Sequence, residues 1–186
     1  MVRLHDIAAD VVRRALEAAP APGGGRVLCV DGPAGSGKTT LAEAVALSAP
    51  ADLSTRVVHM DDAYPGWDGL EDGVARVGRA LVRPLAWGEP GGYRRYDWHE
   101  GREAEWVEVA PVDLMVLEGV GSGALAHAEH VSLLVWVDAP RDVRRSRWQA
   151  REGDTEHLAA WAVAEDEHHA RNRTRERADL EVSGDW

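Results

Sequence analysis

Residues 32–39 read Gly32-Pro33-Ala34-Gly35-Ser36-Gly37-Lys38-Thr39 and match the phosphate-binding loop pattern G-x-x-x-x-G-K-[ST] without a mismatch. Glycines let backbone N–H groups turn inward around a phosphate. The N-terminus of a following helix adds partial positive charge at the same point. The stretch therefore predicts a nucleotide phosphate site whose cofactor-binding residues are Gly32, Ala34, Gly35, Ser36, Gly37, Lys38, Thr39 and Thr40.

The basic residue of this loop stands out in the composition. Lys38 is the only lysine of the chain, and every other basic side chain apart from histidine is arginine. A compact ammonium fits between phosphate oxygens where a planar guanidinium does not. We therefore expect Lys38 to reach the outer phosphates and to take part in catalysis, and the Thr39 hydroxyl to be a ligand of Mg²⁺.

The segments around the loop have the context that such a loop needs. Residues 26–31 read as a buried strand that runs into it, and residues 40–47 read as the helix that leaves it. Further apolar strands are expected at 55–60, 113–117, 131–138 and 180–182. Helices are expected at about 4–19, 70–81 (stopped near Pro84), 141–152 and 155–177. Strands that alternate with helices predict an α/β fold with a parallel sheet and right-handed crossovers.

Length and charge limit the function classes. A chain of 186 residues with 45% hydrophobic residues fits one globular domain, residues 1–186. The net charge of −11 argues against a general binder of nucleic acid or membrane surfaces. Neither a signal-peptide pattern nor a membrane-spanning run is present, and Cys29 cannot form a disulfide within one chain. A cytoplasmic protein is expected, and a homo-oligomer stays open.

Acidic residues follow three of the expected strands. Ligands of such sheets bind beyond the carboxyl ends of the strands. Phosphoryl transfer needs an acid that holds Mg²⁺ and, for an alcohol acceptor, a base that receives the hydroxyl proton. Glu118, after an apolar strand, suits the metal role, and Asp61 suits the base role. The alternative is that these acids only cap the next element, and for Asp31 and Asp62 the two interpretations are equally open.

Arginines recur on one face of the helix expected at 141–152. Arg144, Arg147 and Arg151 have helical spacing. Arginines so placed can stabilise charge on a transferring phosphoryl group. We assign Arg147 to catalysis, Arg144 to the nucleotide and Arg151 to the substrate; the alternative is a solvated face paired with nearby acids. Together with Gly153-Asp154 as a hinge, this helix forms a predicted lid over about residues 141–156.

Aromatic residues alternate with polar ones from Tyr93 to His99, in a stretch expected to form a hairpin with residues 105–109. Tyr96 and Trp98 could form a stacking wall for a planar substrate. A plain amphipathic strand gives the same pattern, so both interpretations stay open here.

Several of these segments together resemble the uridine kinase and phosphoribulokinase group of P-loop kinases. Asp61-Asp62-Ala63-Tyr64 is similar to the Asp-Ser-Phe-Tyr segment of uridine-cytidine kinases, and Tyr96-Asp97-Trp98 to their Tyr-Asp-Phe segment. Leu117-Glu118-Gly119 resembles their Phe-Glu-Gly segment, and residues 142–147 resemble their lid helix. The sequence departs from the pattern at Ala63, at His99, in the short lid loop and in the long polar helix after it.

The resemblance implies a P-loop NTPase fold with five parallel strands in the order 2-3-1-4-5. It also implies an acceptor-binding insertion over about residues 61–110 whose hairpin covers the acceptor. Asp61 takes the role of general base in that family, and Tyr64, Tyr96, Trp98 and Arg151 are the other expected substrate-binding residues. Glu118 and Thr39 are the expected metal ligands, and ATP and Mg²⁺ the expected cofactors.

The leading hypothesis is an enzyme that transfers the γ-phosphoryl group of ATP to a hydroxyl, with a nucleoside such as uridine or cytidine as the favoured acceptor. A second hypothesis keeps ATP and changes the acceptor to a pantothenate-like molecule, a sugar alcohol or a nucleoside monophosphate. A third is an ATP-dependent switch without catalysis. An acceptor base and an arginine-bearing lid favour the kinases, because a switch needs neither.

Overall fold

The computed structural model describes residues 3–152 and 156–186. At its centre lies a sheet of five parallel strands in the order β2-β5-β1-β6-β7. These strands are β1 (Arg26–Asp31), β2 (Thr55–His59), β5 (Leu114–Glu118), β6 (Leu133–Asp138) and β7 (Leu180–Ser183). Counted among the parallel strands alone, this is the predicted order 2-3-1-4-5, and the predicted α/β class is confirmed.

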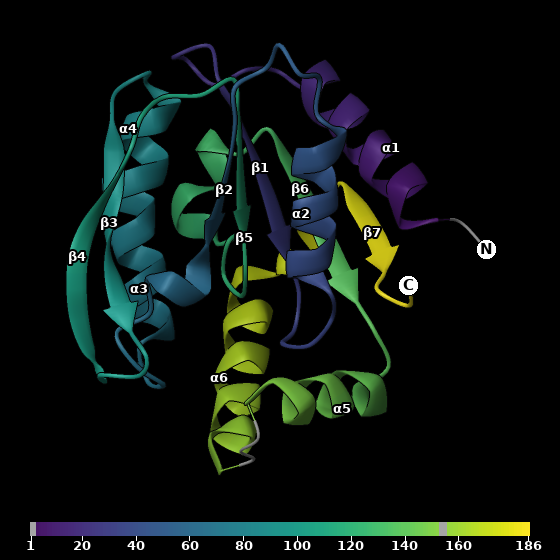
Figure 1. Cartoon of the computed structure of the whole chain (residues 1–186), viewed down its shortest axis with the longest axis vertical. Coiled ribbons are helices and arrows are strands. Elements are labelled where there is room, and N and C mark those ends of the chain that lie inside the picture. The colour runs from purple at the N-terminus through teal and green to yellow at the C-terminus, as the bar shows by residue number, and fades with distance from the viewer. Residues whose placement is uncertain (1–2, 153–155) are drawn as a thin grey trace.

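Helices cover both faces of the sheet (Figure 1). On one face lie α1 (Leu4–Glu17) and α2 (Lys38–Ser48), which bury Val11, Leu41 and Val45 against the alternate strand residues Leu28 and Val116. On the other face the strand residues that point the opposite way, such as Cys29 and Leu117, meet α3 and the helices that follow it. Strands buried on both faces explain the continuous apolar runs of the sequence.

The helix expected at 70–81 runs further than predicted. It consists of α3 (Leu70–Val77), the π-helical turn η2 (Gly78–Val82) and α4 (Arg83–Ala86). Proline has no N–H and normally ends a helix, but Pro84 lies at the start of α4, directly after the π-helical turn, and so interrupts no α-helical bond before it. The prediction that the helix stops near Pro84 was therefore short by two residues.

The carboxyl-terminal helical region also differs in detail. Helix α5 (Arg141–Glu152) and α6 (Glu156–Asn172) match the two predicted helices. The second of these ends early, because Arg173 adopts a left-handed conformation with φ of 48°. A short helix, α7 (Thr174–Arg177), then leads into β7. The predicted hinge at Gly153-Asp154 lies outside the described residues.

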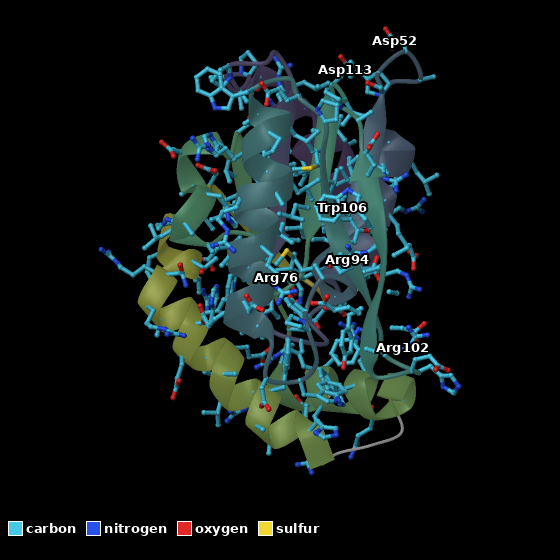
Figure 2. All side chains as sticks on the ribbon, turned by 90° about the vertical axis from the view of Figure 1, so that its left-hand side faces the viewer. Asp52, Arg76, Arg94, Arg102, Trp106 and Asp113 are labelled. Atoms are coloured by element: carbon cyan, nitrogen blue, oxygen red, sulfur yellow. The ribbon has the colours of Figure 1, made fainter. Side chains whose placement is uncertain are left out.

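The expected hairpin is present as β3 (Gly91–Asp97) and β4 (Arg102–Val109), paired antiparallel beside α3 and α4. Figure 2 shows this hairpin from outside, with Arg94 and Trp106 on it and Arg76 on the neighbouring α3. Arg76 forms an ion pair with Glu103 of the hairpin. Short 3-10 turns follow β2 at Met60–Asp62 (η1) and precede β6 at Leu125–His130 (η3). Among the described helices, none combines the length and apolar character required to cross a bilayer.

The segment after β7 packs onto the phosphate-binding loop. Gly184 donates its N–H to the Asp138 carbonyl at 2.7 Å. A Cβ atom at Gly184 would lie 1.8 Å from the Ser36 carbonyl oxygen, so the two backbones are in direct contact there. The indole ring of Trp186 lies against Gly37, where a Cβ atom would be 3.0 Å from the ring. The loop is therefore covered on one side by residues far away in sequence.

This close approach gives a first prediction. Gly184→Ala forces the backbone of residues 183–186 away from the loop, and such overpacking lowers the free energy of unfolding by about 1–3 kcal/mol. In a domain of this size that lowers the melting temperature by about 2–4 °C per kcal/mol. Thermal unfolding measures the change, with Leu47→Ala as control because that side chain is 88% exposed. A Gly184→Ala protein no less stable than the control variant would contradict the packing described.

Candidate active site

The phosphate-binding loop joins β1 to α2. Gly37 caps α2 with a φ of 104°, a left-handed conformation that favours glycine. Lys38, the first residue of α2, is only 8% exposed. Its Nζ donates to the Pro33 carbonyl at 3.0 Å, which folds the side chain back across the loop. The ammonium is thus held at the centre of the loop, where a phosphate would meet it.

Thr39 and Glu118 lie opposite each other at the ends of α2 and β5. The Thr39 hydroxyl donates to Glu118 Oε1 at 3.1 Å. His59, at the end of the neighbouring β2, places its Nδ1 2.6 Å from the same carboxylate oxygen. This hydrogen bond to Glu118 raises the pKa of His59. A hydroxyl and a carboxylate are the oxygen ligands that Mg²⁺ prefers, so these two residues fit the metal role.

Asp31 has a different role from the other strand-end acids. It is fully buried, and its carboxylate accepts hydrogen bonds from the backbone N–H groups of Gly32, Gly121 and Gly123 at 2.7–3.1 Å. His169 of α6 lies 3.0 Å from it. Burial alone would raise the pKa of Asp31, but the contacts with His169 and the backbone amides hold it below its ordinary value. Of the two interpretations left open for Asp31, the structure favours the structural one.

Asp61 and Asp62 lie in the turn η1 that follows β2, where both side chains line the central cavity. The Trp98 indole N–H donates to the Asp61 carbonyl at 2.9 Å. This bond fixes the end of the hairpin against the segment that carries the expected base. The two segments that the sequence linked only through a family resemblance are therefore in contact.

Aromatic rings gather beside Asp61. Trp67 lies at their centre, with the centroids of Trp98, Trp148 and Trp161 within 4.9–6.1 Å and the His157 ring stacked on it at 4.8 Å. The sequence left open whether the hairpin aromatics form a stacking wall or only pack the strand. The first interpretation fits Trp98, and the second fits Tyr96. Trp98 lines the cavity. Tyr96 is not among the lining residues and packs edge-on against Trp98 at 5.0 Å.

Tyr64 also lines the cavity. Its ring is 1% exposed, and its hydroxyl donates to the Val120 carbonyl at 2.6 Å. Burial raises the pKa of this phenol well above its ordinary value, so the hydroxyl stays protonated. The buried ring leaves little surface for an acceptor, and its hydroxyl is already bonded to the protein, so the substrate-binding role of Tyr64 stays a prediction.

The expected lid arginines separate into two groups. Arg147 donates to the carbonyls of Gly35 and Gly184 and lines the cavity. Arg144 turns away from it: its Nε donates to the Ala139 carbonyl, and one Nη lies 3.6 Å from Glu165. The side chain of Arg151 lies outside the described part of the chain. The assignments of Arg144 to the nucleotide and Arg151 to the substrate stay predictions.

One cavity of about 830 Å³ brings these groups together. It extends from the phosphate-binding loop past Glu118 to the aromatic rings. Its lining residues are Ala34, Gly35, Gly37, Lys38, Thr39, Thr40, Glu43, His59, Asp61, Asp62, Tyr64, Trp67, Trp98, Glu118, Val120, Arg147, Trp148 and Trp161. Such a volume is within the usual range for small-molecule sites.

The sequence did not reveal several of these residues. Trp148 and Trp161 are single tryptophans in helices of mostly polar composition, and both rings are buried at 4–5% exposure. A large aromatic residue isolated in a polar helix was the available signal. Glu165, equally buried, is surrounded by exposed acids in the sequence and gave no signal at all. Burial raises its pKa, against the hydrogen bond from Ala34 and the nearby positive charges.

Solved structures share this fold over almost the whole chain. A possible uridine kinase from Bacillus stearothermophilus is 22% identical, with a TM-score of 0.73 over 98% of this chain and 100% of that one. A candidate fructose transport system kinase from Silicibacter sp. TM1040 is 23% identical, with a TM-score of 0.61 over 98% and 100%. D-glycerate 3-kinase from Cryptococcus neoformans var. grubii is 14% identical, with a TM-score of 0.53 over 99% and 92%.

No protein-family model matches the chain, and no curated protein matches it by sequence. At identities below 25%, the likeness to solved structures concerns the fold. It confirms the fold that the resemblance to P-loop kinases of the uridine kinase type implies. The acceptor of this chain has to be argued from its own residues.

The loop geometry gives a second prediction. Lys38→Ala should weaken ATP·Mg binding or make it unproductive. Among the described lysines and arginines, Arg147 is the one other residue that lines the cavity, so little positive charge would remain for the phosphates. Lys38→Arg should also fail, since a guanidinium is too broad for the position. Isothermal titration calorimetry measures the affinity, with Arg145→Ala on the exposed side of α5 as a charge-matched control. ATP affinity and turnover equal to wild type in Lys38→Ala would show that this loop is not the phosphate site.

Proposed function

We propose that the protein is an ATP-dependent small-molecule kinase that transfers the γ-phosphoryl group to a hydroxyl, most favourably that of a nucleoside such as uridine or cytidine. One observation carries the proposal: a single cavity holds a complete phosphate-binding loop, a Thr39–Glu118 pair suited to Mg²⁺, and the acid Asp61 beside tryptophan rings.

The reaction assigns a step to each group. The acceptor hydroxyl oxygen attacks the γ-phosphorus, a new P–O bond forms, and the bond from phosphorus to the β,γ-bridging oxygen breaks to release ADP. The hydroxyl proton passes to the Asp61 carboxylate. Lys38 and Arg147 stabilise the charge on the transferring group. Bound Mg²⁺, which Thr39 and Glu118 would hold, would neutralise phosphate charge.

The aromatic rings support a flat acceptor. Trp98, which is 38% exposed, and Trp67, which His157 covers on one face, line the cavity next to Asp61. Stacking on such rings is worth about 1–3 kcal/mol per base. The names of the solved structures with this fold mention uridine, fructose transport and D-glycerate. Glycerate has no ring to stack, whereas a nucleobase stacks on an indole with its whole plane and a sugar ring with one C–H face; the four tryptophans of this cavity therefore favour the nucleoside most and glycerate least.

An ATP-dependent switch is the alternative from another class. A switch needs ATP binding and a partner surface but no base directed at an acceptor. ADP release separates the two. Wild-type protein with ATP·Mg and a panel of uridine, cytidine, pantothenate, fructose, D-glycerate and nucleoside monophosphates should release ADP fastest with a nucleoside. Turnover of a non-nucleoside alone would leave a kinase with another acceptor, and no turnover above background would favour the switch.

The base role of Asp61 is tested by Asp61→Asn. The variant keeps the shape of the side chain and loses the proton acceptor, so kcat should fall by about 10²–10⁴-fold while ATP·Mg affinity stays unchanged. Asp68→Asn, an exposed change in the following loop that does not line the cavity, is the control. Unchanged phosphoryl transfer in Asp61→Asn would remove Asp61 from the mechanism.

The acceptor wall is tested on the hairpin. Trp98 is 38% exposed and lines the cavity, whereas Trp106 on the same hairpin is 48% exposed and does not. Trp98→Ala should raise KM for the nucleoside by about 5–100-fold, the equivalent of one lost stacking partner, and Trp106→Ala should leave KM unchanged. A lower melting temperature with an unchanged KM in Trp98→Ala would mean that Trp98 only packs the hairpin.

A further inference from the structure

Helix α6 brings a buried carboxylate to the phosphate-binding loop. Glu165 is 2% exposed, and its Oε2 accepts the backbone N–H of Ala34 at 2.9 Å. Its other oxygen lies 3.6 Å from an Nη atom of Arg144. A buried carboxylate with a backbone donor and an arginine beside it is well satisfied, so the contact holds the loop to the helix.

The same face of α6 makes two further contacts. His169, one turn after Glu165, pairs with Asp31 at the start of the loop at 3.0 Å. Trp161, one turn before it, lines the cavity beside Tyr64. Residues four apart lie above one another on a helix. A single helix face therefore contacts the start of the loop, its middle and the aromatic part of the cavity.

Two roles are open to an acid so close to a phosphate site. It could occupy the position of a phosphate and compete with it, or it could support the loop from behind. Glu165 does not line the cavity, and the Lys38 ammonium donates to Pro33 and not to Glu165. Glu165 therefore acts on the loop from outside the set of lining residues, close enough to Lys38 for the two charges to attract.

We infer that Glu165 is a positioning residue of the phosphate-binding loop. By holding the Ala34 peptide, it keeps the loop in the shape in which the following backbone N–H groups and Lys38 face the phosphates. It also holds Arg144 beside the loop. This inference rests on the proposed use of ATP and concerns the affinity for it.

The experiment compares three substitutions at Glu165 by calorimetric titration with ATP·Mg. Glu165→Gln keeps the length and an oxygen acceptor for the Ala34 N–H, so Kd should stay within about threefold of wild type. Glu165→Asp keeps the charge but is one methylene shorter, and Glu165→Ala removes the acceptor. Both should raise Kd by about tenfold or more, as expected for a lost hydrogen bond to a charged group. Glu167→Ala, an exposed change on the same helix, is the control.

The outcomes separate the alternatives. Rescue by glutamine but not by aspartate, with both variants folded at the assay temperature, supports positioning through the Ala34 peptide, because Kd then reports the shape of the loop and not unfolding. Melting temperatures without nucleotide show which variants are folded, and Glu165→Asp decides where Glu165→Ala does not fold. Wild-type Kd in both Glu165→Asp and Glu165→Ala, or tighter binding in either, would overturn the inference. Failure of the wild-type protein itself to bind ATP would instead refute the proposed function on which it rests.

Discussion

The arrangement of the site depends on the buried carboxylate of Asp31. It lies at the end of the central strand and accepts hydrogen bonds from Gly32, Gly121 and Gly123, while His169 contacts it from α6. These groups belong to the phosphate-binding loop, to the turn after β5 and to a distant helix. Because a buried acceptor without its donors is expensive, the three segments are held in one relative position. The loop therefore has its shape before any ligand binds.

The same end of the sheet provides two kinds of environment for ligands. Near the loop, Lys38, Arg147 and the start of α2 present positive charge to phosphates. Farther along, Tyr64 and the tryptophans line the cavity near the Asp61 carboxylate, and of these rings Trp98 is the most exposed. A triphosphate in the first environment and an acceptor hydroxyl in the second would lie in one cavity, and phosphoryl transfer requires that closeness. The hairpin, from the middle of the chain, and α6, from its carboxyl-terminal part, complete the aromatic part.

The sequence predicted most of the features that follow from local sequence patterns. The apolar runs, the loop motif and the acids at strand ends follow from periodicity and from the chemistry of phosphate binding, and Thr39, Glu118, Asp61 and Trp98 lie in one cavity as expected. It could not predict contacts that depend on how distant segments pack. Glu165 reads as one acid among several on a polar helix, and only the docking of α6 makes it buried. Tyr96 matched the alternating pattern of the strand but packs edge-on against Trp98. The alternation alone does not show whether such a side chain lines the cavity or packs beside a residue that does.

The most direct measurement is a crystal structure with a non-hydrolysable ATP analogue, Mg²⁺ and uridine. The account predicts the triphosphate in the loop at residues 32–39, with Mg²⁺ between Thr39 and Glu118. It also predicts the uridine ring against Trp67 and Trp98, and its 5′-hydroxyl hydrogen-bonded to Asp61 at about 3–3.5 Å from the γ-phosphorus. A nucleotide bound away from this loop, or a nucleoside whose hydroxyl points away from both Asp61 and the γ-phosphate, would contradict it.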